Sequence, residues 1–230
     1  MRLFYDPHIE PDAKTHQLNE EESKHVVRVL RMGNGDELGL LDGKGNFYHC
    51  VLTESSKKCL VRIDKCESKD KTEQPVHIAI SPTKQNERME WFVEKATEIG
   101  VDEITFIQTK NSERTKLKLD RFERKAISAM KQSNRWFLPR INQISDINTF
   151  IQNNPNGLIA HCYEGTKTTI SNEINQGVGP ILIGPEGDFT SDELSFALDN
   201  GYKSINLGDN RLRTETAGIV ACTEAVLKLA

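Results

Sequence analysis

The 230-residue chain lacks the sequence patterns that mark several large classes of protein. No apolar run approaches the roughly 18 residues that a membrane-spanning helix needs. Residues 1–7 lack the apolar core of a signal peptide. We therefore expect a cytoplasmic protein without a membrane partner. The hydrophobic fraction of 37% and the charged fraction of 28% are those of an ordinary globular chain, long enough for a small and a medium domain.

Several ligand-binding patterns are also missing. The five cysteines form no C-x-x-C pair, and no histidine lies at metal-ligand spacing from them or in an H-E-x-x-H pattern. We expect no metal site, and reduced thiols that pack as small apolar residues. The chain has no G-x-x-x-x-G-K-S/T, G-x-G-x-x-G or G-x-S-x-G pattern. These absences argue against nucleotide hydrolysis, Rossmann-type cofactor binding and serine hydrolysis.

Basic residues concentrate in one segment of an otherwise acidic chain. The net charge is −4, yet residues 110–140 hold ten Lys or Arg against three acids, which gives this segment a charge of +7. A localised basic segment favours contact with a polyanion such as RNA. The alternative is a solvated helix face without a partner.

The first part of the chain is rich in short strands and turns. Strands are expected at residues 47–52 and 60–63, and one short helix at residues 20–30. This pattern predicts a small β-barrel in residues 1–72. The polar run of residues 67–75 has no apolar periodicity and is expected to be a linker.

From residue 73 onward, strands and helices alternate. Strands are expected at residues 76–80, 104–107, 158–162, 181–183 and 204–207. A helix at residues 87–99 should end at Gly100. Another should begin with a capping box of Thr190 and Glu193, supported by apolar contact of Phe189 with Leu194. The alternation predicts an α/β fold with a mostly parallel sheet.

Two loops that follow predicted strands are candidates for chemistry. Residues 184–187, Gly-Pro-Glu-Gly, follow the buried strand 181–183, and residues 207–217 lead into the last helix. Ligands of open α/β sheets bind where the carboxyl ends of strands meet loops. Glycine also lets a backbone approach a ligand closely. For the first loop the alternative is a plain tight turn. For the second it is that Glu215 only complements the helix dipole.

Together these loops resemble those of the SPOUT class of RNA methyltransferases. The resemblance rests on Gly-Pro-Glu-Gly at 184–187 and on Leu-Arg-Thr-Glu-Thr-Ala at 212–217. Further segments are similar to motifs of the ribosomal RNA small subunit methyltransferase E family, and their order along the chain is that of the family. These segments are residues 25–32, Lys84 with 88–91, 95–101 and 111–115.

The resemblance implies a specific architecture and activity. It implies a PUA-like RNA-binding β-barrel in residues 1–72 and a SPOUT domain in residues 73–230, with a deep C-terminal trefoil knot, working as a homodimer. The implied reaction is methylation of N3 of a uridine in 16S ribosomal RNA of the 30S subunit, with S-adenosyl-L-methionine as methyl donor. The cofactor-binding residues that it implies are Ile183, Gly184, Pro185, Glu186, Gly187, Leu207, Gly208, Leu212, Arg213 and Thr214.

Two positions depart from the family pattern. Asp188 stands where the family usually has glycine, and we expect its side chain to face outward or to cap the helix that begins near Thr190. Asn210 and Arg211 stand in a stretch that is usually Arg-Ile, so the role of Arg211 is open, whereas Arg213 is in register.

Roles for the catalytic residues follow as hypotheses. Arg213 would stabilise negative charge on the uracil oxygens, and either Glu186 or Glu215 would be the base that removes the N3 proton. Asn111 and Arg114 would contact substrate from across the dimer.

Further RNA contacts are expected outside these loops. His25, Arg28 and Arg31 recur every third residue on the predicted helix and would form a basic stripe. Arg135 adjoins Trp136 and Phe137, which either stack on a base or pack in a core.

Three alternatives remain open from the sequence. Within the same fold, the chain could modify transfer RNA or methylate a ribose 2′-hydroxyl. In a different class, it could be an RNA-binding assembly factor without activity.

Overall fold

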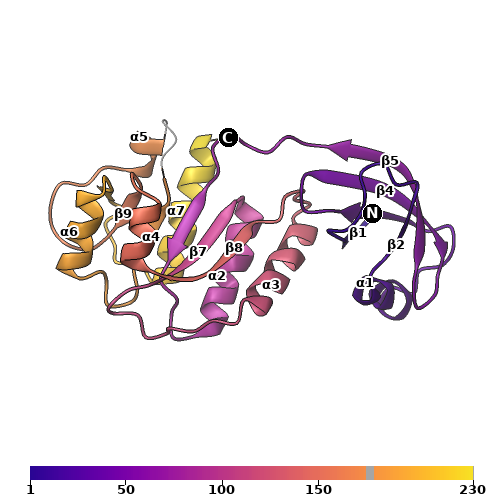
Figure 1. The fold of residues 1–230 in the computed structure, drawn as a ribbon, viewed down its shortest axis with the longest axis horizontal. Helices are drawn as coiled ribbons and strands as arrows, with labels where there is room; N and C mark the ends of the chain where they lie inside the picture. Colours follow the sequence, from indigo (N-terminus) through magenta and orange to yellow (C-terminus); the bar gives the residue numbers. More distant parts are fainter. Residues whose placement is uncertain (175–178, 230) are drawn as a thin grey trace. The chain divides into compact units, whose positions relative to one another are not determined.

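The computed structural model describes residues 1–174 and 179–229. The chain divides into two compact units (Figure 1). The first unit consists of Met1–Thr72 with Met130–Leu138, and the second of Glu73–Ala129 with Pro139–Ala230. No helix in the described part of the chain is long and apolar enough to cross a membrane.

The first unit is built on a five-stranded sheet. Its strands are β1 (Arg2–Tyr5), β2 (Thr15–Gln17), β3 (Glu37–Leu41), β4 (Asn46–Glu54) and β5 (Leu60–Ser68), in the spatial order β1-β3-β4-β5-β2. β1 pairs with β3 in parallel, and the other pairs are antiparallel. The predicted linker begins too early, because Glu67 and Ser68 still pair with β4.

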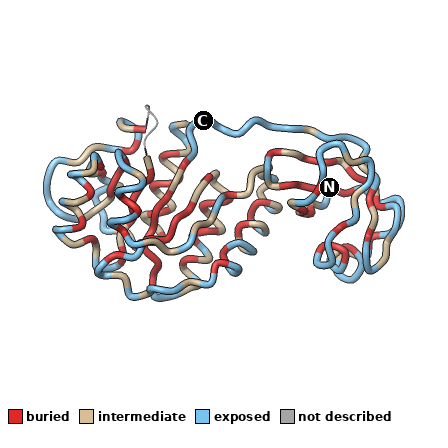
Figure 2. The backbone as a smooth tube through the Cα atoms, in the orientation of Figure 1, coloured by how far each residue is buried: buried red, intermediate tan, exposed pale blue. Residues whose placement is uncertain are grey.

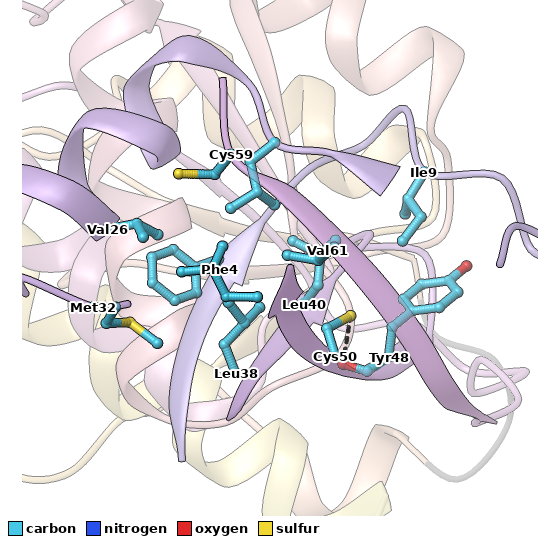
Figure 3. Packing of buried hydrophobic residues seen from close by; sticks show 12 residues of the cluster. Phe4, Ile9, Val26, Met32, Leu38, Leu40, Tyr48, Cys50, Cys59 and Val61 are labelled. Carbon is cyan, nitrogen blue, oxygen red and sulfur yellow. Dashed lines mark hydrogen bonds between the residues drawn. The ribbon is translucent and has the colours of Figure 1, made fainter. Parts of the chain in front are cut away.

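The sheet of the first unit covers an apolar core. Phe4, Leu38, Leu40 and Val61 are fully buried and lie in one cluster, which Figure 3 shows together with Cys50 and Cys59. Cys50, Cys59 and Cys222 are buried free thiols, which agrees with the expectation of apolar packing. Cys66 and Cys162 are exposed, so the expectation fails for these two.

A second, smaller cluster explains why residues 130–138 belong to the first unit. Leu41, Phe47 and Met130 are buried in it, and Trp136 and Leu138 pack against them. The ring of Trp136 stacks on that of Phe47 at a centroid distance of 5.4 Å. Trp136 therefore packs in a core. The predicted boundary at residue 72 places this segment in the second domain, since local patterns do not reveal which core a segment joins.

The predicted helix at residues 20–30 is two different helices. α1 (Glu20–Lys24) is an α-helix capped by Asn19, and η1 (His25–Val29) is a π-helix. The prediction that His25, Arg28 and Arg31 form a stripe on one helix is therefore wrong. The wider turn changes the angular spacing of side chains, and Arg31 lies beyond the helix with φ of 51°.

The second unit contains a six-stranded sheet in which every pairing is parallel. Its spatial order is β11-β9-β10-β6-β7-β8. The strands are β6 (His77–Ile80), β7 (Glu103–Gln108), β8 (Arg140–Asp146), β9 (Leu158–Ala160), β10 (Ile181–Ile183) and β11 (Lys203–Ile205). The prediction of an α/β fold with a mostly parallel sheet is confirmed, although β8 was missed.

Helices cover both faces of this sheet, whose central strands are buried (Figure 2). α2 (Asn86–Ile99) packs on α7 (Thr214–Leu229), which also contacts β6, β10 and α5 (Ile170–Glu173). α4 (Ile147–Asn153) and α6 (Ser191–Asp199) share a different apolar cluster with Ala79, Ile159 and Leu182. α3 (Leu119–Gln132) is joined to α2 by ion pairs.

Two local predictions for the second unit are confirmed in detail. The Thr190 hydroxyl and the Glu193 carboxylate form the capping box of α6. Gly100 ends α2 with φ of 133°, a backbone conformation that residues other than glycine rarely adopt. Gly218 allows a close approach in α7, since a Cβ there would lie 2.6 Å from the Phe92 ring of α2.

Candidate functional site

Three loops at one edge of the parallel sheet enclose a cavity of about 850 Å³. The loops follow β9, β10 and β11. These three strands are adjacent in the sheet, so their carboxyl ends meet at the same edge. A volume of this size is typical of sites for small ligands. Nine of the ten predicted cofactor residues line the cavity. Gly187 is not part of the lining, as far as the structure describes it.

The loop after β10 is held by hydrogen bonds from two directions. The side-chain Nδ2 of Asn111 donates to the carbonyl oxygens of Gly187 and Asp188, at 3.2 and 3.0 Å. From the start of α7, the Thr214 hydroxyl donates to the carbonyl oxygen of Gly184 at 3.1 Å. Pro185 is buried, whereas Glu186 is exposed and lines the cavity. The loop is therefore fixed in place while its acidic side chain stays accessible.

The loop after β11 has backbone N–H groups without an acceptor among the described residues. Within the described residues, the backbone N–H groups of residues 207–212 have no hydrogen-bond partner. Gly208 has φ of 115°, and a Cβ placed on it would meet no atom within 4 Å. Arg211 ties this loop to the previous one by donating from Nη2 to the carbonyl oxygen of Glu186 at 3.2 Å. Free N–H groups beside a cavity are suited to binding the acceptors of a ligand.

The loop after β9 contributes residues that the sequence analysis missed. His161, Cys162, Gly165 and Lys167 line the same cavity. Burial lowers the pKa of the His161 imidazole, and the nearby Lys167 ammonium lowers it further. Its Nε2 lies 2.9 Å from the Ser204 hydroxyl. A strand was predicted at residues 158–162, whereas β9 ends at Ala160, and the rule that ligands meet the carboxyl ends of parallel strands would have pointed to the loop that follows it.

Asp188 does not face outward, and it does not cap α6, whose cap is Thr190. Its Oδ2 accepts a hydrogen bond from the backbone N–H of Cys162 and its Oδ1 from that of Phe189, both at 2.8 Å. It adopts φ of 64° and lines the cavity. The expected orientation was wrong because the loop after β9 supplies a donor from 26 positions away in the sequence.

The two candidate bases lie in different surroundings. Glu215 is 7% exposed, and its Oε1 lies 3.7 Å from Nε of Arg88 on α2. It is not among the described residues that line the cavity, unlike Glu186. Arg213 is exposed and lines the cavity, and its side chain has no hydrogen bond or ion pair to any described residue. Of the three residues, Glu186 and Arg213 are therefore free to act on a bound substrate.

Comparison with known proteins agrees with this arrangement. A family model for an RNA methyltransferase domain matches residues 70–226, and a model for an RNA methyltransferase PUA domain matches residues 18–64. The ribosomal RNA small subunit methyltransferase E of Buchnera aphidicola is 30% identical over 229 residues, covering 94% of this chain and 90% of that protein. This chain belongs to the ribosomal RNA small subunit methyltransferase E family.

Solved structures with the same fold include members of this family. A probable rRNA-methyltransferase from Porphyromonas gingivalis is 45% identical with a TM-score of 0.87, covering 96% of this chain and 95% of that one. The ribosomal RNA small subunit methyltransferase E of Neisseria gonorrhoeae, solved bound to S-adenosyl methionine, is 27% identical with a TM-score of 0.85 and the same coverage.

Several residues expected to touch RNA also have partners in their own chain. Asn111 holds the loop after β10, and Arg114 donates to the carbonyl oxygen of Lys84 at 2.6 Å. On α3, Arg121 and Lys125 form ion pairs with Glu90 and Glu94 of α2. Part of the basic segment is therefore occupied by interactions that hold helices together.

Other basic residues remain accessible. Lys116, Lys118 and Arg124 are exposed and form no ion pair with any described residue. In the first unit, Arg28 and Arg31 are exposed, whereas His25 and Arg135 are half-buried. Lys24, His25 and Arg28 line a concave surface together with the acids Glu20 and Glu21.

Proposed function

We propose that this protein is an S-adenosylmethionine-dependent methyltransferase that methylates N3 of a specific uridine in 16S ribosomal RNA of the small subunit. The observation that carries the proposal is the cavity formed by the three loops, with backbone N–H groups at residues 207–212 that have no partner among the described residues. Family membership supports the substrate class, and the relative with bound S-adenosyl methionine supports the cofactor.

The residues that line the cavity fit this cofactor. S-adenosylmethionine has an adenine, a ribose and an amino-acid group, so it offers many acceptors for backbone N–H groups. The residues that would hold it are Ile183, Gly184, Pro185 and Glu186 from the loop after β10, and Leu207, Gly208, Leu212, Arg213 and Thr214 from the loop after β11. When bound, it supplies an electrophilic methyl group.

The protein's own residues then prepare the uridine. N3 of uridine carries a proton and is a poor nucleophile until that proton leaves. Glu186, whose carboxylate is exposed in the cavity, takes this proton and leaves the electron pair on N3. The cofactor would supply the methyl group to this nitrogen, and its C–S bond would break to leave S-adenosylhomocysteine as the neutral product. Arg213 stabilises the negative charge that spreads to the uracil oxygens as the proton leaves. Burial beside Arg88 removes Glu215 from the proposal as a base and gives it a structural role.

The same proposal covers the wider architecture. The first unit would be a PUA-like barrel that binds RNA through Arg28, Arg31 and Arg135, and the protein would work as a cytoplasmic homodimer. The C-terminal part would also form the trefoil knot that the family resemblance implies, and the place of β10 between β6 and β9, both of which precede it in sequence, is compatible with one. Light scattering on the purified protein tests the dimer, which requires twice the 26.0 kDa chain mass.

The decisive experiment is methyl transfer from labelled S-adenosylmethionine to unmodified small subunits and to free 16S ribosomal RNA. The product is digested to nucleosides and identified by mass spectrometry. N3-methyluridine is the expected product. A 2′-O-methyl nucleoside would point to the ribose-modifying members of the fold, and cofactor binding without transfer to either substrate would overturn the proposal.

A further inference from the structure

The carboxylate of Asp188 joins two of the three loops that form the cavity. Its Oδ2 accepts from the backbone N–H of Cys162, in the loop after β9, at 2.8 Å. Its Oδ1 accepts from the N–H of Phe189, in its own loop, also at 2.8 Å. Hydrogen bonds to a charged acceptor are stronger than those between neutral groups. One side chain therefore connects the carboxyl ends of two neighbouring strands.

The backbone at Asp188 is in a conformation that this side chain makes tolerable. Its φ of 64° lies in the left-handed region, which most residues other than glycine avoid. Aspartate enters this region when its short side chain bonds locally, as Oδ1 does with the next N–H. The other oxygen is then available for the loop after β9.

Further hydrogen bonds hold the loop after β10. Asn111, which follows β7, donates to the carbonyl oxygens of Gly187 and Asp188. In the loop after β9, residues 162–166 are exposed, and the Tyr163 hydroxyl adds one more bond, to the carbonyl oxygen of Phe189 at 2.8 Å. Hydrogen bonds at residues 188 and 189 thus hold the outer part of the loop after β9 against the loop after β10.

We propose that Asp188 is a positioning residue that sets the width of the cofactor cavity by holding the loop after β9 against the loop after β10. The role rests on the proposed function, since it acts on the site for S-adenosylmethionine. Asp188 touches no reacting atom in this account. It acts through the backbone of Cys162, which lines the cavity beside it.

Cofactor affinity measured by calorimetry tests the role without an activity assay. Asp188→Ala and Asp188→Gly remove both hydrogen bonds, and we expect S-adenosylmethionine to bind about tenfold more weakly, the effect of removing one charge-assisted bond. Asp188→Gly also relieves the left-handed backbone, so it separates the missing bond from strain. Asp188→Asn keeps one oxygen acceptor and should lie between. Asp199→Asn, which removes an exposed carboxylate at the end of α6, should bind as the wild type does.

The thiol of Cys162 gives a second readout that a general decrease in stability would not mimic. Burial raises the pKa of this thiol, and the Asp188 carboxylate raises it further. In a Cys66→Ser background, which removes the other exposed thiol, Asp188→Gly should lower the thiol pKa of Cys162. The pH profile of its alkylation would then move to lower pH.

The outcomes separate this role from the proposed function. If the wild-type protein binds S-adenosylmethionine and Asp188→Ala and Asp188→Gly bind it with the same affinity, the positioning role alone is overturned. An unmoved alkylation profile shows that the carboxylate does not lie beside Cys162, and it overturns the role as well. Absence of wild-type binding overturns the proposed function and the role together, whereas weaker binding with a moved profile supports both.

Discussion

The hydroxyl of Thr214 donates a hydrogen bond to the carbonyl oxygen of Gly184 across 3.1 Å. Thr214 is the first residue of α7, and Gly184 follows the last residue of β10. Both residues line the cavity. This hydrogen bond fixes the two loops that carry most of the proposed cofactor residues at one shared point. Changes at this point should therefore alter both the stability of the protein and its affinity for the cofactor.

Replacement of Thr214 by valine tests that link. Thr214→Val keeps the shape of the side chain but leaves the Gly184 carbonyl without this donor, at a cost of about 1–3 kcal/mol in the free energy of unfolding. S-adenosylmethionine should also bind more weakly in calorimetry. The matched control is Thr223→Val on the same helix, whose hydroxyl bonds the carbonyl of Ile219 away from the cavity. Equal cofactor affinity in the two variants would contradict the link.

Arg213 and Arg211 should separate catalysis from binding. Arg213→Ala is expected to lower kcat by roughly 10²–10³-fold while cofactor affinity stays close to that of the wild type, because the backbone of residue 213 stays beside the cofactor and only the guanidinium, which acts on the charge of the substrate, is lost. Arg211→Ala removes the bond to the Glu186 carbonyl, so cofactor affinity should fall instead. Steady-state kinetics combined with calorimetry gives both quantities. A large drop in cofactor affinity in Arg213→Ala would show that its role is misassigned.

Glu186 and Glu215 should separate a catalytic role from a structural one. Glu186→Gln removes the proposed base, so kcat should fall by roughly 10²–10⁴-fold in steady-state kinetics while the protein stays as stable as the wild type. Glu215→Gln changes a buried acid next to Arg88, so thermal unfolding should occur at a lower temperature while kcat stays close to that of the wild type. The reverse pattern would make Glu215 the base and would require the helix start to rearrange when substrate binds.

The basic segment contains two populations that a salt titration can distinguish. Neutralising Lys116, Lys118 and Arg124, which are exposed and unpaired within the described residues, should reduce the slope of log affinity against log salt by up to about 2, since each phosphate that a cation neutralises adds roughly 0.7 to the slope. Neutralising Arg121 and Lys125, which pair with α2, should mainly lower stability. Equal slopes for wild type and the triple variant would exclude this surface from RNA binding.

Elements with strong local signals were predictable from the sequence. β10 is a continuous apolar run, and the capping box of α6 uses residues three positions apart, so both could be located without tertiary information. β8 was missed because it is an edge strand with no fully buried residue, which leaves only a weak apolar pattern. The π-helix at η1 also gave no periodicity that distinguishes it from an α-helix.

The candidate site was predictable only in part, for a related reason. Both glycine-containing loops could be named from their residues and from the family resemblance. The contribution of the loop after β9 depends on strand order, because β9 adjoins β10 and β11 only in the folded sheet. The orientation of Asp188 likewise depends on Cys162, and the place of Met130–Leu138 depends on a core built by Leu41 and Phe47. Such long-range partners leave no mark in a local pattern.

The central claim is that the loops after β9, β10 and β11 form one pocket that binds a methyl donor. Isothermal titration of the purified protein with S-adenosylmethionine and with its demethylated product tests this most directly. The account predicts saturable binding of both compounds, with one molecule for each complete pocket. No detectable heat with either compound, at protein concentrations where the chain is folded, would contradict it.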